Sequence, residues 1–158
     1  MVDAALTSSS DYNAQTAAGF SRLNTPVVSG QHYGAWSAGS ARLDEWIQVD
    51  LGSVKVIESV TSQGRSDANQ YITQYKVLTS LDGVTFTMVS NAAGSADELF
   101  PGNQDRNSLV TNSLPVPVVA RFVRILPTAR RGWVSLRWDL NGCNYGMCTY
   151  RNPTKETE

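Results

Sequence analysis

The chain has 158 residues, of which 41% are hydrophobic and 17% charged, and its formal net charge is −1. This length fits one domain that folds without metal or disulfide cross-links, and the composition excludes a disordered chain. The near-zero net charge argues against a nucleic-acid partner, which would need a basic field. No apolar run approaches the roughly 20 residues that span a bilayer as a helix.

The first part of the chain predicts short strands joined by long polar loops. Residues 6–9 are expected to form a strand, and residues 11–19 (DYNAQTAAG) a loop of small and polar residues. Residues 25–43 contain Gly and Pro at several positions, and so long an irregular connection is usually functional or packed tightly on the scaffold. Hydrophobic and polar residues alternate over residues 45–51, which predicts a strand, and a further strand is expected over residues 55–64.

A central strand is predicted over residues 71–79. The alternation places Tyr75 and Val77 on one face of the extended chain and Ile72 on the other. The dipeptide Asp82-Gly83 follows this strand, and Asp-Gly favours the positive φ angles of a tight hairpin turn.

Four more strands complete the predicted fold, at residues 86–90, 108–114, 119–126 and 134–140. Pro115 and Pro117 separate the second of these from the third, because proline cannot donate to a strand ladder. About eight strands, frequent turn residues and no convincing helix indicate an all-β antiparallel sandwich or jelly roll.

Two arginines, Arg124 and Arg137, lie inside predicted strands among apolar neighbours. A cation on the core side of a strand must be paired, so Asp50 or Asp139 is the expected partner. We therefore predict a structural role for both arginines and not a role in ligand binding.

Five motifs give the chain a family resemblance: EWIQVDLG (45–52), QGRSDANQYITQYKVLTSLDG (63–83), FPGN (100–103), ARFVRILP (120–127) and SLRWDLNGC (135–143). Their order resembles that of the discoidin domain, also called the factor V/VIII type C domain. The resemblance implies an eight-stranded antiparallel jelly-roll sandwich, like that of galactose-binding domains. It would cover residues 1–143 and leave residues 144–158 as a C-terminal tail or linker.

The sequence shows no matched catalytic constellation, so we do not expect an enzyme. His32 is the only histidine, and the glycine spacing around Ser37, its closest candidate partner, misses the nucleophile elbow by one residue. We expect His32 and Trp36 to be structural or to line a binding rim. No cofactor is expected; calcium is a lesser alternative, through isolated acids whose default role is turn formation, namely Asp67, Asp97 and Asp105.

The resemblance implies that three loops converge at one end of the barrel: residues 11–19, 65–70 and 128–133. Together they carry aromatic faces and planar donors, which suits sugars because CH-rich rings stack on aromatics while hydroxyls, sulfates and carboxylates accept from guanidinium groups. The predicted ligand-binding residues are Tyr12, Arg65, Asp67, Asn69, Gln70, Arg130, Arg131 and Trp133. Tyr12 matches an aromatic pocket position of peptide-binding relatives. The alternative is a solvated basic rim with Trp133 turned inward and Tyr12 packed on its own loop.

We therefore expect a noncatalytic adhesion or lectin-like module for cell-surface or matrix glycans and glycoproteins. Weak single-site sugar affinity makes a homo-oligomer useful for adhesion. One alternative is peripheral binding to anionic phospholipid such as phosphatidylserine through the arginines, although residues 11–19 and 65–70 lack an adjacent Trp or Leu pair. Another is protein-ligand recognition, which is disfavoured because Ala41 stands where peptide-binding relatives carry a carboxylate.

The cysteines and the start of the chain leave the location open. In many animal members of the family, a cysteine placed like Cys143 pairs with one near the N-terminus, and that partner is absent here. A local disulfide with Cys148, free thiols and an intermolecular disulfide all stay open. Residues 1–10 lack the charged start and apolar core of a signal peptide. We expect an extracellular or cell-surface location, with the secretion signal missing; a cytosolic or unconventionally exported protein is the alternative.

Overall fold

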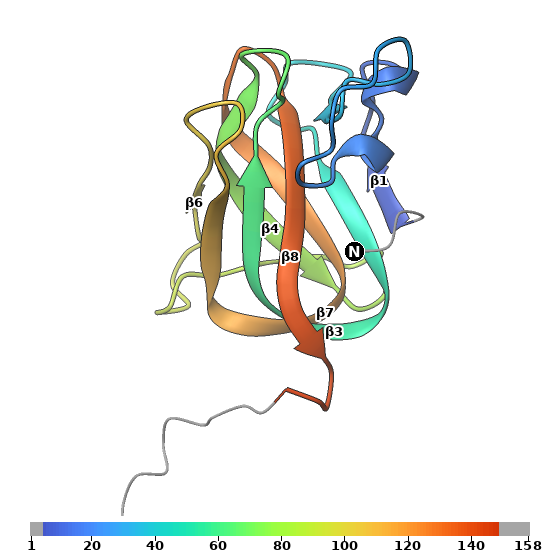
Figure 1. Ribbon diagram of the computed structural model, residues 1–158. Helices are drawn as coiled ribbons and strands as arrows, with labels where there is room; N and C mark the ends of the chain where they lie inside the picture. Colours follow the sequence, from blue (N-terminus) through green and yellow to red (C-terminus); the bar gives the residue numbers. More distant parts are fainter. Residues whose placement is uncertain (1–4, 149–158) are drawn as a thin grey trace, which may run out of the picture.

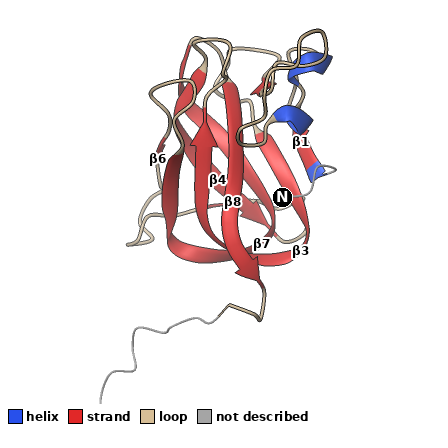
Figure 2. Ribbon diagram, viewed as in Figure 1, coloured by secondary structure: helices blue, strands red, loops and turns tan. Residues whose placement is uncertain are grey.

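The computed structural model describes residues 5–148, in which eight antiparallel strands curl into a barrel-like sandwich (Figure 1). The strands are β1 (Leu6–Ser8), β2 (Trp36–Ser37), β3 (Ile47–Gln63), β4 (Tyr71–Ser80), β5 (Thr87–Met88), β6 (Phe100–Pro101), β7 (Val110–Arg131) and β8 (Ser135–Asn144). Their order is β2-β8-β3-β7-β4-β5, with β1 on β3 and β6 on β4. Two single 3-10 turns, η2 (Ala14–Thr16) and η3 (Ala18–Phe20), interrupt the first loop (Figure 2). The predicted all-β fold is confirmed.

Strands β3 and β7 are longer than predicted, because each joins two segments that were expected to be separate strands. In β3 the chain bends at Gly52, whose φ is +76°, and then pairs with β7 again. In β7 residues 114–117 have no register partner in β3, so Pro115 and Pro117 lie in a bulge where no ladder hydrogen bond is lost. Both strands thereby pass from one side of the sandwich to the other.

The predicted alternation along β4 is wrong at the start of the strand. Ile72 is buried in the core together with Tyr75 and Val77, although it was placed on the opposite face. The register against β7 shifts between Ile72 and Gln74 and again between Gln74 and Tyr75. Such an irregularity turns the side chains that follow it to the other face of the strand.

The turn after β4 is wider than the predicted tight hairpin. Gly83 has the expected positive φ of +77°, but residues 81–86 all lie between β4 and β5. The carboxylate of Asp82 stabilises this loop by accepting from the backbone N–H groups of Val84 and Thr85, each at 2.9 Å.

The predicted partners of the two strand arginines are wrong, and of the two only Arg137 is buried. Arg124 donates to Gln48 Oε1 at 2.8 Å and lies 3.9 Å from two ring centroids, those of Trp46 and Phe86. Arg137 donates to the backbone oxygen of Gly64 at 2.7 Å. Asp50 instead pairs with Arg121, at 2.8 Å. A guanidinium group can be satisfied by neutral acceptors and aromatic rings as well as by a carboxylate. The alternation of residues along a strand does not reveal which of these partners a buried or half-buried arginine has.

The core fills the space between the sheet layers. Its largest fully buried side chains are those of Trp36, Trp138 and Tyr75, and the predicted inward residues Ile47 and Val49 are also fully buried. Within residues 5–148 no helix is long and apolar enough to cross a membrane.

Candidate ligand-binding site

The structure brings the three predicted loops together at one end of the barrel, which we call the loop end (Figure 1). Gly132 lies so close to the 65–70 loop that a β-carbon there would stand 2.5 Å from the carbonyl oxygen of Asn69. The rings of Tyr12 and Trp133 meet edge to face with their centroids 5.8 Å apart. Two further segments lie at this end. Residues 31–44 are joined to Trp133 by a hydrogen bond, and residues 102–109 are joined to Asn69 by another.

Tyr12 and Trp133 differ in how firmly they are held. Tyr12 is 61% exposed, and its backbone N–H donates to the carbonyl oxygen of Ser37 at 2.8 Å. Trp133 is half-buried, and its indole Nε1 donates to the carbonyl oxygen of Ala38 at 2.8 Å. The pair therefore offers an open aromatic face on a fixed base, which is what stacking against a sugar ring requires.

Arg65 is held on several sides of its guanidinium group. It forms a bidentate ion pair with Asp67, at 2.6 and 3.1 Å, and its Nη1 donates to Gln70 Oε1 at 3.3 Å. Its Cζ lies 4.7 Å from the ring centroid of Tyr33, and only 13% of its side chain is exposed. Three predicted site residues are thus brought together, but Arg65 is used mainly to hold the loop.

Arg130 and Arg131 are both exposed but lie on opposite faces of β7. Arg130 pairs with the buried Ile72 and turns over the end of the barrel, where its Nε donates to the carbonyl oxygen of Ala41 at 2.8 Å. Arg131 pairs with Tyr71, and directly opposite residues share a face, so it lies on the outer side. The expected single patch of three arginines is therefore divided. We call the surface on the inner side the mouth; it consists of Tyr12, Ala41, Arg130 and Trp133.

Glu45 ties the loops beneath the mouth together. It is 9% exposed, and its carboxylate accepts from three hydroxyl groups, those of Ser9, Ser10 and Ser40. Burial raises the pKa of Glu45, but these hydrogen bonds and the charge of Arg42 outweigh burial and hold the pKa below its usual range. An ionised Glu45 therefore fixes the start of the loop that carries Tyr12.

The acids considered for calcium each have another partner. Asp67 pairs with Arg65, Asp97 accepts from Lys76 at 3.0 Å, and Asp105 accepts from the backbone of residues 107 and 108. Within the described part of the chain, no three His, Cys, Asp or Glu side chains gather as a metal site. These acids serve ion pairs and turns.

The residues weighed for catalysis are engaged separately. His32 stacks on Phe20 with ring centroids 4.2 Å apart, while the hydroxyl of Ser37 lies 2.7 Å from that of Ser135. Trp36 is fully buried, and its Nε1 donates to the carbonyl oxygen of Ser10. His32 and Trp36 therefore pack the scaffold.

The family model of the F5/8 type C domain matches residues 5–140. The chain belongs to this family. Lactadherin of Bos taurus is 41% identical over 113 residues, which cover 70% of this chain and 26% of lactadherin. Discoidin II of Dictyostelium discoideum superposes with a TM-score of 0.80 at 31% identity, over 93% of this chain and 57% of that chain. This F5/8 type C domain thus spans about a quarter of the length of the lactadherin that it matches.

A more distant structure has the same fold. It is a Clostridium perfringens protein in complex with GalNAc-β-1,3-galactose, with a TM-score of 0.61 at 20% identity over 85% of this chain and 92% of that chain. At this identity the likeness shows the fold of the F5/8 type C domain alone.

Sequence reasoning missed two residues at the loop end of this F5/8 type C domain. Tyr33 covers the Arg65 guanidinium, although the two residues lie far apart in the sequence. Arg106 donates from Nε to Asn69 Oδ1 at 3.1 Å and joins the 102–109 loop to the 65–70 loop. A usable signal for Arg106 was Asp105 followed by Ser108, a spacing that favours a capped turn and an outward side chain between them.

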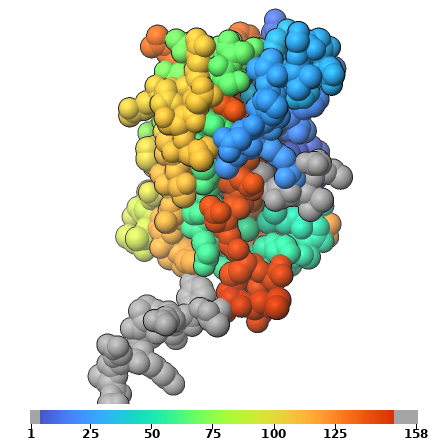
Figure 3. Space-filling view, viewed as in Figure 1, coloured from blue at the N-terminus to red at the C-terminus, as the bar shows by residue number. Residues whose placement is uncertain are grey.

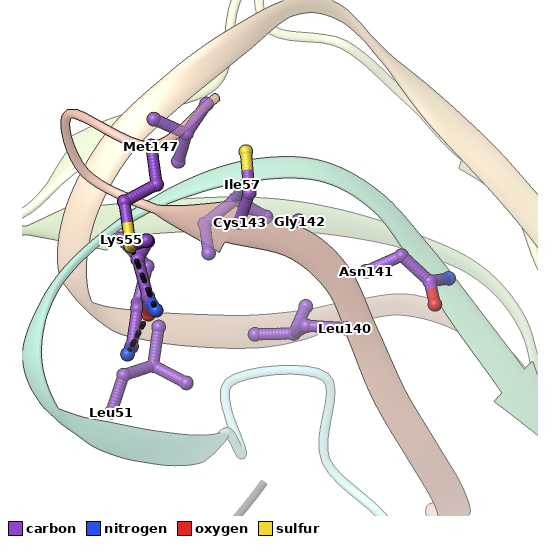
Figure 4. Close-up of a pocket in the computed structure, with 10 residues that line it drawn as sticks. Leu51, Lys55, Ile57, Leu140, Asn141, Gly142, Cys143 and Met147 are labelled. Atoms are coloured by element: carbon purple, nitrogen blue, oxygen red, sulfur yellow. Dashed lines mark hydrogen bonds between the residues drawn. The ribbon is translucent and has the colours of Figure 1, made fainter. Parts of the chain in front are cut away.

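A different hollow lies at the opposite end of the domain, beside the end of β8 (Figure 4). It has a volume of about 500 Å³ and a largely apolar lining that includes Leu51, Ile57, Leu140 and Met147. Lys55 donates to Asn144 across it. Cys143 and Cys148 form a disulfide next to it, with Cα atoms 5.7 Å apart, so the structure has the local disulfide among the three alternatives. This hollow contains none of the predicted ligand-binding residues.

Proposed function

We propose that this F5/8 type C domain is a noncatalytic module that binds cell-surface or matrix glycans, and that the mouth holds the sugar. The observation that carries the proposal is the exposed ring of Tyr12 against Trp133, next to the guanidinium group of Arg130. Arg130 donates to the carbonyl oxygens of Ala41 and Gly132, and a guanidinium group has five N–H donors, so others remain for a ligand. The aromatic ring can stack on the CH groups of a sugar, while the planar donors beside it can bond the hydroxyl or acidic groups of the same sugar.

The fold and the disulfide are compatible with this proposal. The same fold holds a sugar in the Clostridium perfringens complex. The Cys143–Cys148 disulfide fits an oxidising compartment, which supports an extracellular or cell-surface location. Glycan binding at one site is usually weak, so we propose that adhesion uses several copies of the domain in a homo-oligomer or on one surface.

Anionic phospholipid is a second candidate ligand. Arg130 and Arg131 are exposed at the loop end, and so is the apolar side chain of Leu43 in the neighbouring segment. Each arginine near an anionic bilayer contributes about 1 kcal/mol of attraction. This attraction weakens with salt, whereas ring stacking does not.

The test uses the full chain on a broad glycan array, in parallel with liposomes with and without phosphatidylserine. Tyr12→Ala and Arg130→Gln should each weaken binding to the selected glycan about tenfold, since each removes one of the two recognition elements. Tyr145→Ala is the matched control, because Tyr145 is 65% exposed but follows β8 at the far end of the domain. Arg65→Ala is less informative, because Arg65 holds the loop.

Sugar-competed binding that is lost in the Tyr12 and Arg130 variants and kept in the Tyr145 variant supports the proposal. Equal losses in all three variants, or wild-type glycan binding in the Tyr12 and Arg130 variants, would overturn it. Binding confined to phosphatidylserine liposomes would replace the glycan by the phospholipid headgroup.

A further inference from the structure

Arg137 is a buried cation that donates to neutral groups. It is 3% exposed, and its guanidinium group donates to the carbonyl oxygens of Gly64 and Arg106 and to Asn107 Oδ1, at 2.7, 3.0 and 3.0 Å. Burial lowers its pKa, and the charge of Asp67 acts in the opposite direction. Asp67 itself is engaged by Arg65 in a bidentate pair. The charge of Arg137 is therefore held beneath the 65–70 and 102–109 loops without a carboxylate bonded to it.

A polar hollow lies where these two loops meet on the outer side of the loop end. It has a volume of about 420 Å³, and we call it the outer hollow; its lining consists of Asn69, Tyr71, Gln104, Asp105, Arg106, Asn107 and Ser108. Arg137 bonds two of its lining residues from below, Arg106 and Asn107. Figure 3 shows the 102–109 segment, coloured gold, at the same end as the green 65–70 segment. The hollow is thus built over a buried positive charge.

Exposed arginines around the outer hollow add to the positive charge of Arg137. Arg106 uses Nε for Asn69 Oδ1 at 3.1 Å, which leaves its two Nη groups for a ligand. Arg131 lies on the same face as Tyr71, which lines the hollow. Asp105 is the acid in the lining, and its carboxylate is occupied by the backbone N–H groups of residues 107 and 108 and by the Ser108 hydroxyl. The charge of Asp67 near Arg137 is balanced by its pair with Arg65. Arg106, Arg131 and Arg137 against the engaged carboxylate of Asp105 therefore leave the hollow with a positive potential.

The outer hollow and the mouth share a wall. The backbone carbonyl of Asn69 makes the close contact with Gly132, next to Trp133 of the mouth, and its side-chain Oδ1 accepts from Arg106 Nε. A ligand bound at the mouth can therefore extend over Asn69 into the outer hollow.

We infer that the outer hollow is an anion subsite that takes the sulfate or carboxylate group of an acidic glycan whose neighbouring ring is held at the mouth. The inference rests on the proposed function, and it narrows the ligand from glycans in general to acidic ones. Arg106 supplies planar donors to the anionic oxygens. Arg137 adds the electrostatic attraction of its buried positive charge, which lies beneath the loop backbone.

The experiment measures the isotopically labelled full chain by NMR against sodium sulfate, with sodium chloride at equal ionic strength as the reference. It also measures binding of a sulfated chondroitin tetrasaccharide and of its desulfated counterpart. Sulfate should shift the backbone amides of Arg106 and Asn107. The sulfated tetrasaccharide should bind about tenfold more tightly than the desulfated one, and Arg106→Gln should remove this preference.

The matched control is Arg42→Gln, which makes the same change of charge on an exposed arginine of the loop end that pairs with Asp44. Loss of the sulfate preference in Arg106→Gln together with its retention in Arg42→Gln supports the subsite. Equal losses in both variants would show general electrostatic attraction and overturn it. Urea unfolding of both variants checks that the fold is kept.

The two proposals fail in different ways. If no glycan binds but sulfate still shifts the amides of the 102–109 loop, the proposed function fails, and with it the acidic glycan as ligand, while the outer hollow stands only as a site for small anions. If glycans bind at the mouth while sulfate gives neither amide shifts nor a preference, the anion subsite is overturned and the proposed function stands.

Discussion

The backbone of Gly132 packs against the carbonyl oxygen of Asn69, and this contact locks the 128–133 loop onto the 65–70 loop. Gly132 has a φ of +67°, and a β-carbon on it would lie 2.5 Å from that oxygen. Both the backbone conformation and the close approach therefore require glycine. The position of Trp133 in the mouth depends on this contact.

We expect Gly132→Ala to destabilise the domain more than Gly30→Ala does. Gly30 has a similar φ of +75°, but nothing lies within 4 Å of an added β-carbon. The positive φ costs about 1–2 kcal/mol for alanine at either position, and the clash adds at least about 1 kcal/mol at Gly132. Urea unfolding of both variants measures the difference. Equal free energies of unfolding would mean that the two loops are not locked together here.

Stability should fall in acid through Glu45. Its folded-state pKa is depressed, so its contribution is fully present above the unfolded pKa of about 4.3 and is lost as the pH falls through the folded value. Glu45→Gln should cost about 1–3 kcal/mol near neutral pH, and the gap to the wild type should narrow below about pH 4. Chemical unfolding at several pH values measures this gap. Glu58→Gln, at an exposed position of β3, is the control, and a gap for Glu45→Gln that stays constant down to pH 2 contradicts the prediction.

Replacing the buried guanidinium group of Arg137 should be costly. Arg137→Met leaves the carbonyl oxygens of Gly64 and Arg106 without their donor, and unsatisfied buried acceptors cost about 1–3 kcal/mol each. We expect a loss of about 2–4 kcal/mol, because removing the desolvated charge offsets part of the cost. Thermal unfolding measures it against Arg121→Met, a partly exposed arginine that should lose less than about 1 kcal/mol. A neutral Arg137→Met would show that the loop backbone does not depend on this cation.

Reduction of the Cys143–Cys148 disulfide should lower stability modestly. The bridge has a sequence separation of 5, and a loop this short restricts the unfolded chain by about 2 kcal/mol. Urea midpoints with and without dithiothreitol measure the effect. The double variant Cys143→Ser, Cys148→Ser should not respond to the reductant. A dimer band on a non-reducing gel would instead indicate an intermolecular bridge.

Local patterns predicted the fold where neighbours along the chain decide the structure. The alternation of Ile47 and Val49 gave the correct buried face of β3, and the Asp-Gly pair gave the positive φ of Gly83. The family motifs gave the topology as a resemblance, and the match over residues 5–140 confirms it. The predicted strand ends were wrong, because a bulge such as that at residues 114–117 changes the direction of the chain without ending the strand.

The loop end was less predictable, because its contacts join residues distant in sequence. The three loops do meet, but the engagement of Arg65 by Tyr33 and the separation of Arg131 from Arg130 depend on tertiary packing and on strand pairing. The composition of a loop shows which donors it carries. It does not show which of them the scaffold itself already uses.

Strand β8 starts beside the loop end at Ser135 and finishes at Asn144, on the far side of the barrel (Figure 1). Anything joined to the chain after this strand is therefore attached at the end of the domain opposite the loop end. An array of copies tethered in this way to a solid support or to a cell would present every mouth and every outer hollow away from the support. The proposed binding sites would then face outward from the support.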